Sequence, residues 1–131
     1  MQVMGLIEKV LLVDDDGTCL FLTGRLLGKL LPGAEVQTAP NGAEALGLLR
    51  EGAETGRQPQ LVICDIDMPL MDGLAFTREA ERLELLDFGS TRLVLNSSSL
   101  LFRDIDRAKV NPAVIFVPKP LTREKLLGVI G

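Results

Sequence analysis

Short apolar runs recur along the chain and alternate with longer segments in which apolar residues are spaced as on one face of a helix. A run such as Val10–Val13 or Leu61–Cys64 is typical of a strand buried on both faces of a sheet. The runs predict strands within residues 8–16, 35–39, 60–65, 91–96 and 113–117. The spaced segments predict helices over residues 17–31, 43–50, 72 to about 87, 99–109 and 121–130.

Strands that alternate with helices along a chain form successive right-handed βαβ units. The pattern therefore predicts an α/β fold with one doubly wound, five-stranded parallel sheet and helices on both faces. The first helical segment, residues 17–31, is rich in leucine, so we expect it to be mostly buried, with Asp16 as its N-cap. Residues 51–60 are polar and contain Gly and Pro, which predicts a loop. The 131 residues fit a single domain, residues 1–131, with its core starting near residue 8.

Composition narrows the classes of function. A net charge of -4 argues against a nucleic-acid-binding surface, which needs clustered Lys and Arg. The sequence shows no membrane span and no signal peptide, so we expect a cytoplasmic location. His is absent, and Cys19 and Cys64 lack the spacing of metal ligands, which disfavours zinc sites and Ser-His or Cys-His catalysis. Both cysteines are expected to be small core residues.

Polar side chains follow the ends of four predicted strands: Asp14–Asp16, Asp65, Ser97 and Lys119. The carboxyl ends of parallel strands share one edge of the sheet, so we expect these groups to converge. Converging carboxylates repel one another unless a cation joins them, and oxygen ligands favour Mg²⁺ or Mn²⁺. A metal, an ammonium group and a hydroxyl are what a transferring phosphoryl group requires, and Asp65 is the natural nucleophile.

Each of these residues, taken alone, is more typical of a helix cap, a turn or a solvated surface charge. Their joint arrival at one sheet edge favours a functional site, because independent turn chemistry need not produce it.

Four segments carry a resemblance to a known family: VLLVDDD, CDIDMPLMDG, LVLNSS and FVPKP. Over essentially its full length the chain resembles a response-regulator receiver domain of two-component signalling, similar to the chemotaxis regulators. The resemblance implies the flavodoxin-like strand order 2-1-3-4-5. It also implies metal binding by Asp14 and Asp15, phosphate acceptance and metal binding by Asp65, and a backbone carbonyl of Asp67 directed at the metal.

The same resemblance implies how a phosphate signal is transmitted. Ser97 is the hydroxyl that moves toward the phosphate, Lys119 is the lysine that accompanies it, and Phe116 is the aromatic residue whose rotamer reports the switch. The Lys119–Pro120 bond is expected to be cis. Gly73 is expected to supply backbone freedom in the phosphorylation loop.

Three residues depart from the usual pattern of the family. Asn96 is polar where the fourth strand usually ends in an apolar residue, Ser97 stands where Thr is commoner, and Phe116 stands where Tyr is commoner. These departures concern the details of switching more than phosphorylation itself.

The resemblance implies a phosphorylation-controlled switch. A sensor histidine kinase or a histidine phosphotransfer protein presents phosphohistidine, and the chain catalyses its own modification at Asp65. The partner surface that changes is expected over residues 99–109, 113–117 and 121–130. The signal could pass to an output domain, to a separate downstream protein or through a phosphorylation-dependent dimer, and the sequence leaves these three routes open.

Two alternatives also stay open. The Asp65-Ile66-Asp67 sequence resembles the start of haloacid-dehalogenase-type phosphatases, although that family carries this motif after its first strand. A receiver-like module that signals without phosphate is the other, and the complete set of acid, hydroxyl and lysine argues against it.

Overall fold

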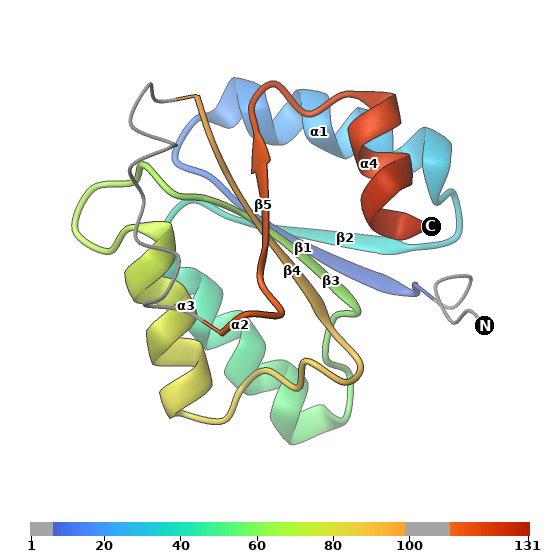
Figure 1. Ribbon diagram of the computed structural model, residues 1–131. Coiled ribbons are helices and arrows are strands. Elements are labelled where there is room, and N and C mark those ends of the chain that lie inside the picture. The colour runs from blue at the N-terminus through green and yellow to red at the C-terminus, as the bar shows by residue number, and fades with distance from the viewer. Residues whose placement is uncertain (1–6, 99–110) are drawn as a thin grey trace.

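A five-stranded parallel sheet with helices on both faces organises the computed structural model, which describes residues 7–98 and 111–131 (Figure 1). The strand order is β2-β1-β3-β4-β5, and every neighbouring pair is parallel. This confirms the predicted fold class and strand order. In chain order the elements are β1 (Lys9–Val13), α1 (Gly17–Leu30), β2 (Glu35–Ala39), α2 (Gly42–Thr55), β3 (Leu61–Asp65), α3 (Gly73–Arg82), β4 (Arg92–Ser97), β5 (Ile115–Pro118) and α4 (Arg123–Ile130).

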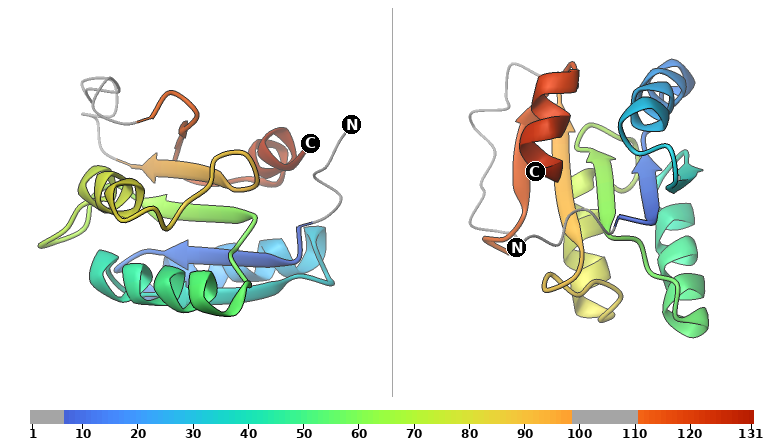
Figure 2. Two further views of the ribbon diagram at one scale, coloured as in Figure 1. Left: turned by 90° about the horizontal axis from the view of Figure 1, so that it is seen from below. Right: turned by 90° about the vertical axis from the view of Figure 1, so that its right-hand side faces the viewer.

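The sheet separates two apolar layers, because successive side chains of a strand point to opposite faces. α2 and α3 cover one face and α1 and α4 cover the other, as the views in Figure 2 show together with Figure 1. On the α2 and α3 side, strand residues such as Leu11 and Leu95 belong to the same core cluster as Phe76. On the α1 and α4 side, Leu12 belongs to the same core cluster as Leu126. Both faces of β1 and β3 are therefore buried, which explains their continuous apolar runs.

Each described helix begins at a residue whose side-chain oxygen accepts a hydrogen bond from a backbone N–H in the first turn. Asp16 caps α1, as predicted, and Asp72 caps α3. Asn41 and Thr122 do the same for α2 and α4. All four caps lie at the carboxyl edge of the sheet, because each described helix follows a parallel strand. Asp16 and Asp72 cap the helices that follow β1 and β3.

The prediction that the first helix is mostly buried was wrong. Leu27 is the buried residue of α1, whereas Phe21 and Leu22 are 61% and 59% exposed. The reason is geometric: a helix that packs on a sheet buries one stripe of its surface, and α1 has more apolar residues than that stripe holds. The exposed pair lies in the first half of α1, close to the edge where β1 ends.

Two helix boundaries also differ from the prediction. α2 continues to Thr55, so the predicted loop over residues 51–60 is shorter. Gly52 lies within the helix, buried against the backbone of Arg57, and the helix ends at Gly56, which takes the left-handed conformation with φ 74°. α3 ends at Arg82, because Glu84 takes φ 58° and the chain turns to bury Leu85.

The predicted helix over residues 99–109 lies outside the described residues. The described ranges contain four helices and five strands. None of these helices has the length and apolar character needed to cross a membrane.

Phe76 of α3 is fully buried in the core cluster between the sheet and the helices α2 and α3, and its truncation tests the packing of this layer. We expect Phe76→Ala to lower the free energy of unfolding by about 3–5 kcal/mol, because it removes a large core side chain and leaves a cavity. Phe21→Ala, at an exposed position, serves as the matched control and should change it by less than about 0.5 kcal/mol. Urea denaturation measures both, and equal effects would contradict the layer assignment.

Candidate functional site

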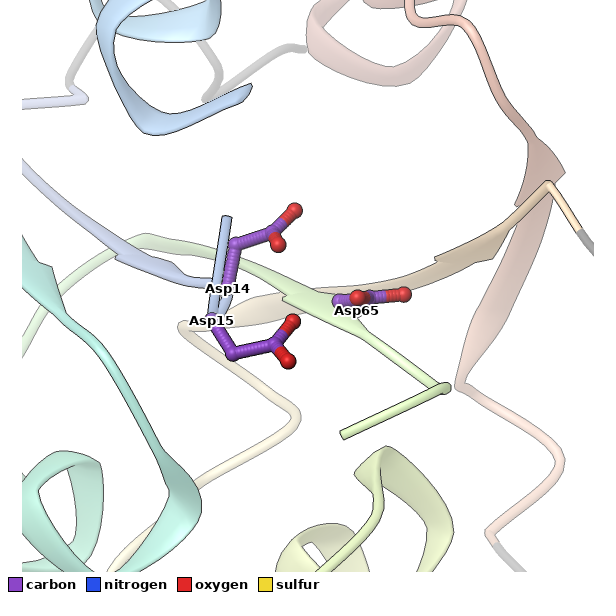
Figure 3. Close-up of side chains that lie close together, drawn as sticks. All are labelled: Asp14, Asp15 and Asp65. Carbon is purple, nitrogen blue, oxygen red and sulfur yellow. The ribbon is translucent and has the colours of Figure 1, made fainter. Parts of the chain in front are cut away.

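Three carboxylates meet at the carboxyl edge of the sheet. Asp14 and Asp15 follow β1, and Asp65 is the last residue of β3 (Figure 3). One carboxylate oxygen of each lies within 4.8 Å of the others. Asp14 and Asp65 are buried, at 7% and 5% exposure, while Asp15 is exposed. The predicted convergence of these strand ends is therefore present in the structure.

Lys119 brings the positive charge to this group from the end of β5. Its Nζ lies 2.9 Å from Asp14 Oδ2 and 3.5 Å from Asp65 Oδ2. The backbone N–H of Lys119 donates to the Ser97 carbonyl at 3.0 Å, which continues the pairing of β5 with β4, and the Lys119–Pro120 bond is cis, as predicted. Burial alone lowers the pKa of Lys119, but the hydrogen bond and charge of Asp14 and the charge of Asp65 outweigh it and raise the pKa above its usual value.

The pKa of Asp65 is raised from 3.8 to about 6. Burial is the largest cause, and the negative charge of Asp14 adds to it. Lys119 and the backbone N–H of Asp67, which donates to Asp65 Oδ1 at 3.1 Å, act in the opposite direction. One ammonium group thus fails to balance the crowded carboxylates, and further positive charge at this edge is favourable.

Ser97 and Asp67 form a contact that the sequence analysis did not predict. The Ser97 hydroxyl, which is buried at the end of β4, donates a hydrogen bond to the Asp67 side chain. The sequence analysis considered only the backbone carbonyl of Asp67, and its spacing from Asp65 was the signal that could have suggested a side-chain role. The contact ties the end of β4 to the loop after β3.

Phe116, unlike the carboxylates, has apolar surroundings. It is partly buried and packs against the core cluster on the α2 and α3 side, paired in register with Leu95 of β4. Its role as a rotamer switch stays a prediction.

Gly73 is needed for space rather than for backbone freedom, which corrects the sequence analysis. A Cβ at Gly73 would lie 2.6 Å from the carbonyl oxygen of Asp65. Among the described residues, Leu70 is the one in this loop with a left-handed backbone, with φ 70°. The close approach of α3 to β3 therefore fixes the position of Asp65.

Cys19 is not the core residue that the sequence analysis expected. It is partly exposed on α1, and its Sγ lies 3.5 Å from Lys119 Nζ. Cys64 is fully buried, as expected. The third acid, Asp16, acts as the α1 cap and is not among the clustered carboxylates.

The family model for the response regulator receiver domain matches residues 10–131 of this chain, so the chain belongs to this protein family. A two-component response regulator of Oryza sativa subsp. japonica is 34% identical over 122 residues, covering 93% of this chain and 90% of that protein. A solved two component response regulator from Cytophaga hutchinsonii has a TM-score of 0.83 at 31% identity and covers 94% of this chain and 93% of its own.

Other relatives are much longer than the matched region. The transcriptional regulatory protein AruR of Pseudomonas aeruginosa is 40% identical over 76 residues, which are 58% of this chain and 30% of that protein. The match to the sensor histidine kinase CheAY of Helicobacter pylori, at 29% identity, covers 92% of this chain and 14% of that protein. The receiver domain thus occurs among these relatives both as most of a protein and as a small part of one.

Receiver domains generally bind Mg²⁺ at an acidic pocket, and this chain has such a cluster of aspartates. The donor set fits the ion, because it consists of carboxylate oxygens, the hard ligands that Mg²⁺ prefers. The raised pKa of Asp65 agrees with this, since burial and the charge of Asp14 both disfavour its ionised form and a bound cation would favour that form.

The titration of Asp65 should be visible in protein stability. Between pH 3.8 and about 6 the folded chain retains a proton that the unfolded chain has released, so the free energy of unfolding falls as pH rises through this window. The total change is about 3 kcal/mol. We therefore expect Asp65→Asn, which stays neutral, to be more stable than the natural chain at neutral pH without divalent ions, and nearly equal to it at the acidic end of the window.

Urea denaturation in EDTA at a series of pH values measures this difference. Asp72→Asn is the matched control, because Asp72 is an exposed cap and Asn also caps helices. A stability difference between Asp65→Asn and the natural chain that does not vary with pH would contradict the prediction.

Proposed function

We propose that the chain is a phosphorylation-controlled switch that accepts a phosphoryl group on Asp65 from a phosphohistidine donor. The observation that carries this proposal is the placement of a buried Asp65 carboxylate between two further acids and the Lys119 ammonium group. The pKa of about 6 leaves Asp65 mostly ionised at neutral pH, so it needs no general base to act as a nucleophile.

In the proposed step the carboxylate oxygen of Asp65 attacks phosphorus, a P–O bond forms and the P–N bond of phosphohistidine breaks. The electron pair of that bond returns to the imidazole nitrogen of the donor. The chain contributes orientation and charge: the N–H of Asp67 holds Asp65 Oδ1, and Lys119 lies on the side of Oδ2.

Asp14, Asp15 and Asp65 are the residues proposed to hold Mg²⁺, with the backbone carbonyl of Asp67 as a further ligand. The ion, when bound, supplies the positive charge that lets an anionic phosphoryl group approach an anionic carboxylate. Asp14 has a second proposed task, because it already accepts a hydrogen bond from Lys119 and so positions that ammonium group.

The proposed readout begins with hydrogen-bond exchange. A phosphoryl group on Asp65 offers oxygens that compete with Asp67 for the Ser97 hydroxyl and with Asp14 for Lys119. Ser97 ends β4 and Lys119 follows β5. A movement of either residue therefore alters the protein surface next to these strand ends. We propose that this surface, comprising residues 99–109, β5 and α4, is the one whose partner changes.

The donor is proposed to dock on the first half of α1. Phe21 and Leu22 present apolar surface there, and Arg25 lies over the Phe21 ring at 5.8 Å. Exposed apolar side chains beside a reactive group are typical of a protein interface. A sensor histidine kinase or a histidine phosphotransfer protein is the proposed occupant, since either can present phosphohistidine to Asp65.

Intact mass measurement after incubation with acetyl phosphate and Mg²⁺ tests the central proposal. We expect one added phosphoryl group that hydroxylamine removes, and we expect none in Asp65→Asn or in EDTA. Asp15→Asn should need a Mg²⁺ concentration at least about tenfold higher, because it removes one ligand charge. Asp16→Asn is its matched control, since it removes a neighbouring charge and keeps a good helix cap.

Three outcomes are informative. A labile adduct confined to Asp65 supports the switch. Rapid turnover of unrelated phosphoesters would instead support the phosphatase alternative, and a folded chain that forms no adduct would support a module that signals without phosphate.

The docking proposal predicts a separation between two phosphodonors. Phe21→Ala should slow phosphotransfer from a phosphorylated histidine phosphotransfer domain by about tenfold or more, because an exposed aromatic side chain is lost from the interface. Its reaction with acetyl phosphate should be unchanged. Leu127→Ala, at an exposed apolar position on α4, is the control and should affect neither donor. Equal slowing of both donors by Phe21→Ala would place its effect in folding rather than docking.

A further inference from the structure

Lys119 belongs to a short segment between β5 and α4, residues 118–120, that has few backbone hydrogen-bond donors (Figure 1). Its neighbours Pro118 and Pro120 have no N–H group, so the backbone N–H of Lys119 is the single backbone donor of these three residues. That N–H donates to the Ser97 carbonyl at 3.0 Å. The carbonyl groups of the two prolines are therefore important for holding this segment in place.

Lys125, in the first turn of α4, binds both of these carbonyl groups. Its Nζ donates to the Pro118 oxygen at 2.9 Å and to the Pro120 oxygen at 3.0 Å, so the ammonium group bridges the residues on either side of Lys119. The backbone N–H of Lys125 donates to the Thr122 hydroxyl, which caps the same helix. Segment 118–120 is thus tied at both prolines to the first turn of α4.

The position of Lys125 in the helix is unfavourable without these contacts. The N-terminus of a helix carries partial positive charge, which repels a cation in the first turn. The two carbonyl oxygens offset that repulsion, because hydrogen bonds from a charged donor are stronger than neutral ones. The next residue, Leu126, is fully buried in the core cluster on the α1 and α4 side, so this part of α4 is firmly held. Lys125 therefore connects segment 118–120 to the packed core.

We propose that Lys125 is a positioning residue, which holds segment 118–120 so that the Lys119 ammonium group stays between Asp14 and Asp65. The Lys119 side chain is 15% exposed, and its Nζ lies 2.9 Å from Asp14 Oδ2 and 3.5 Å from Asp65 Oδ2. A long side chain keeps such distances only if its backbone is fixed, and a displacement of about 1 Å at a reacting group can cost much of a rate.

The consequence for phosphotransfer rests on the proposed function. When Lys119 moves away from Asp65, it no longer stabilises the charge of the transferring phosphoryl group, so the reaction with acetyl phosphate slows. The position of Lys119 is a property of the chain without phosphate or metal, and it can be measured on its own. A failure of the positioning and a failure of the switch are therefore separate results.

Acetylation of lysine side chains in EDTA tests the position of Lys119. The reagent is sulfo-N-hydroxysuccinimide acetate, and peptide mass spectrometry gives the rate at each lysine. Lys119 should react slowly while it is held in its ion pairs and faster when it is displaced from them. Lys29, which is exposed on α1, is the internal reference, and Lys9, which is buried in β1, reports any general loss of structure.

We expect Lys125→Met, which keeps the aliphatic stem, to raise the acetylation rate of Lys119 relative to Lys29 by about fivefold, because the hydrogen bonds to the segment are lost. Its melting temperature should not fall, since the change removes a cation from a helix N-terminus. Lys125→Arg retains the charge and the donors, and its Lys119 should react as in the natural chain. Arg123→Met is the matched control, because it removes a positive charge from the same turn of α4.

The rate of phosphorylation by acetyl phosphate should fall by about fivefold in Lys125→Met and recover in Lys125→Arg. An unchanged acetylation rate of Lys119 in Lys125→Met overturns the proposal. An equal rise in Arg123→Met, or a simultaneous rise at Lys9, overturns it as well, because the cause would then be charge or a general loosening of the fold. If the natural chain accepts no phosphoryl group, the proposed function fails, and the acetylation rates still decide whether Lys125 positions Lys119.

Discussion

Two buried carboxylates, Asp14 and Asp65, share a single ammonium group at the carboxyl edge of the sheet, and a third acid, Asp15, lies beside them. Lys119 cannot neutralise all of them, and burial makes the excess charge costly, so the pKa of Asp65 rises to about 6. A site of this kind gains stability from any added positive charge. The same imbalance that weakens the folded chain at neutral pH makes the edge suited to a divalent ion.

The rest of the fold keeps these charges together. Parallel pairing places the ends of β1, β3, β4 and β5 on one edge, and apolar layers on both faces of the sheet hold those strands rigid. Gly73 lets α3 approach the backbone of Asp65 so closely that a side chain could not fit. By contrast, Ser97 and Lys119 are held by side-chain hydrogen bonds to Asp67 and Asp14, and such bonds can be exchanged without disturbing the core. Asp65 is thus held by the backbone packing of α3 on β3, whereas Ser97 and Lys119 are held by side-chain hydrogen bonds.

The amino-acid pattern was sufficient to predict the parallel sheet and the convergence of acids and lysine, because both depend on features that repeat: apolar strand runs and strand ends. The order of the strands came from the resemblance to the receiver family. It failed where the outcome depends on three-dimensional packing. The exposure of Phe21 and Leu22 depends on which stripe of α1 meets the sheet, and the ends of α2 and α3 depend on Gly52 and Leu85 finding buried positions. The contacts of Ser97 with Asp67 and of Cys19 with Lys119 join residues whose side chains no local pattern relates.

The central claim, that Asp65 carries unbalanced negative charge which a divalent ion relieves, can be tested by NMR titration of its side-chain carboxyl carbon with and without Mg²⁺. The account predicts a pKa of about 6 in EDTA and a clear decrease on addition of Mg²⁺. An Asp65 pKa near 3.8 in EDTA that Mg²⁺ does not alter would contradict it.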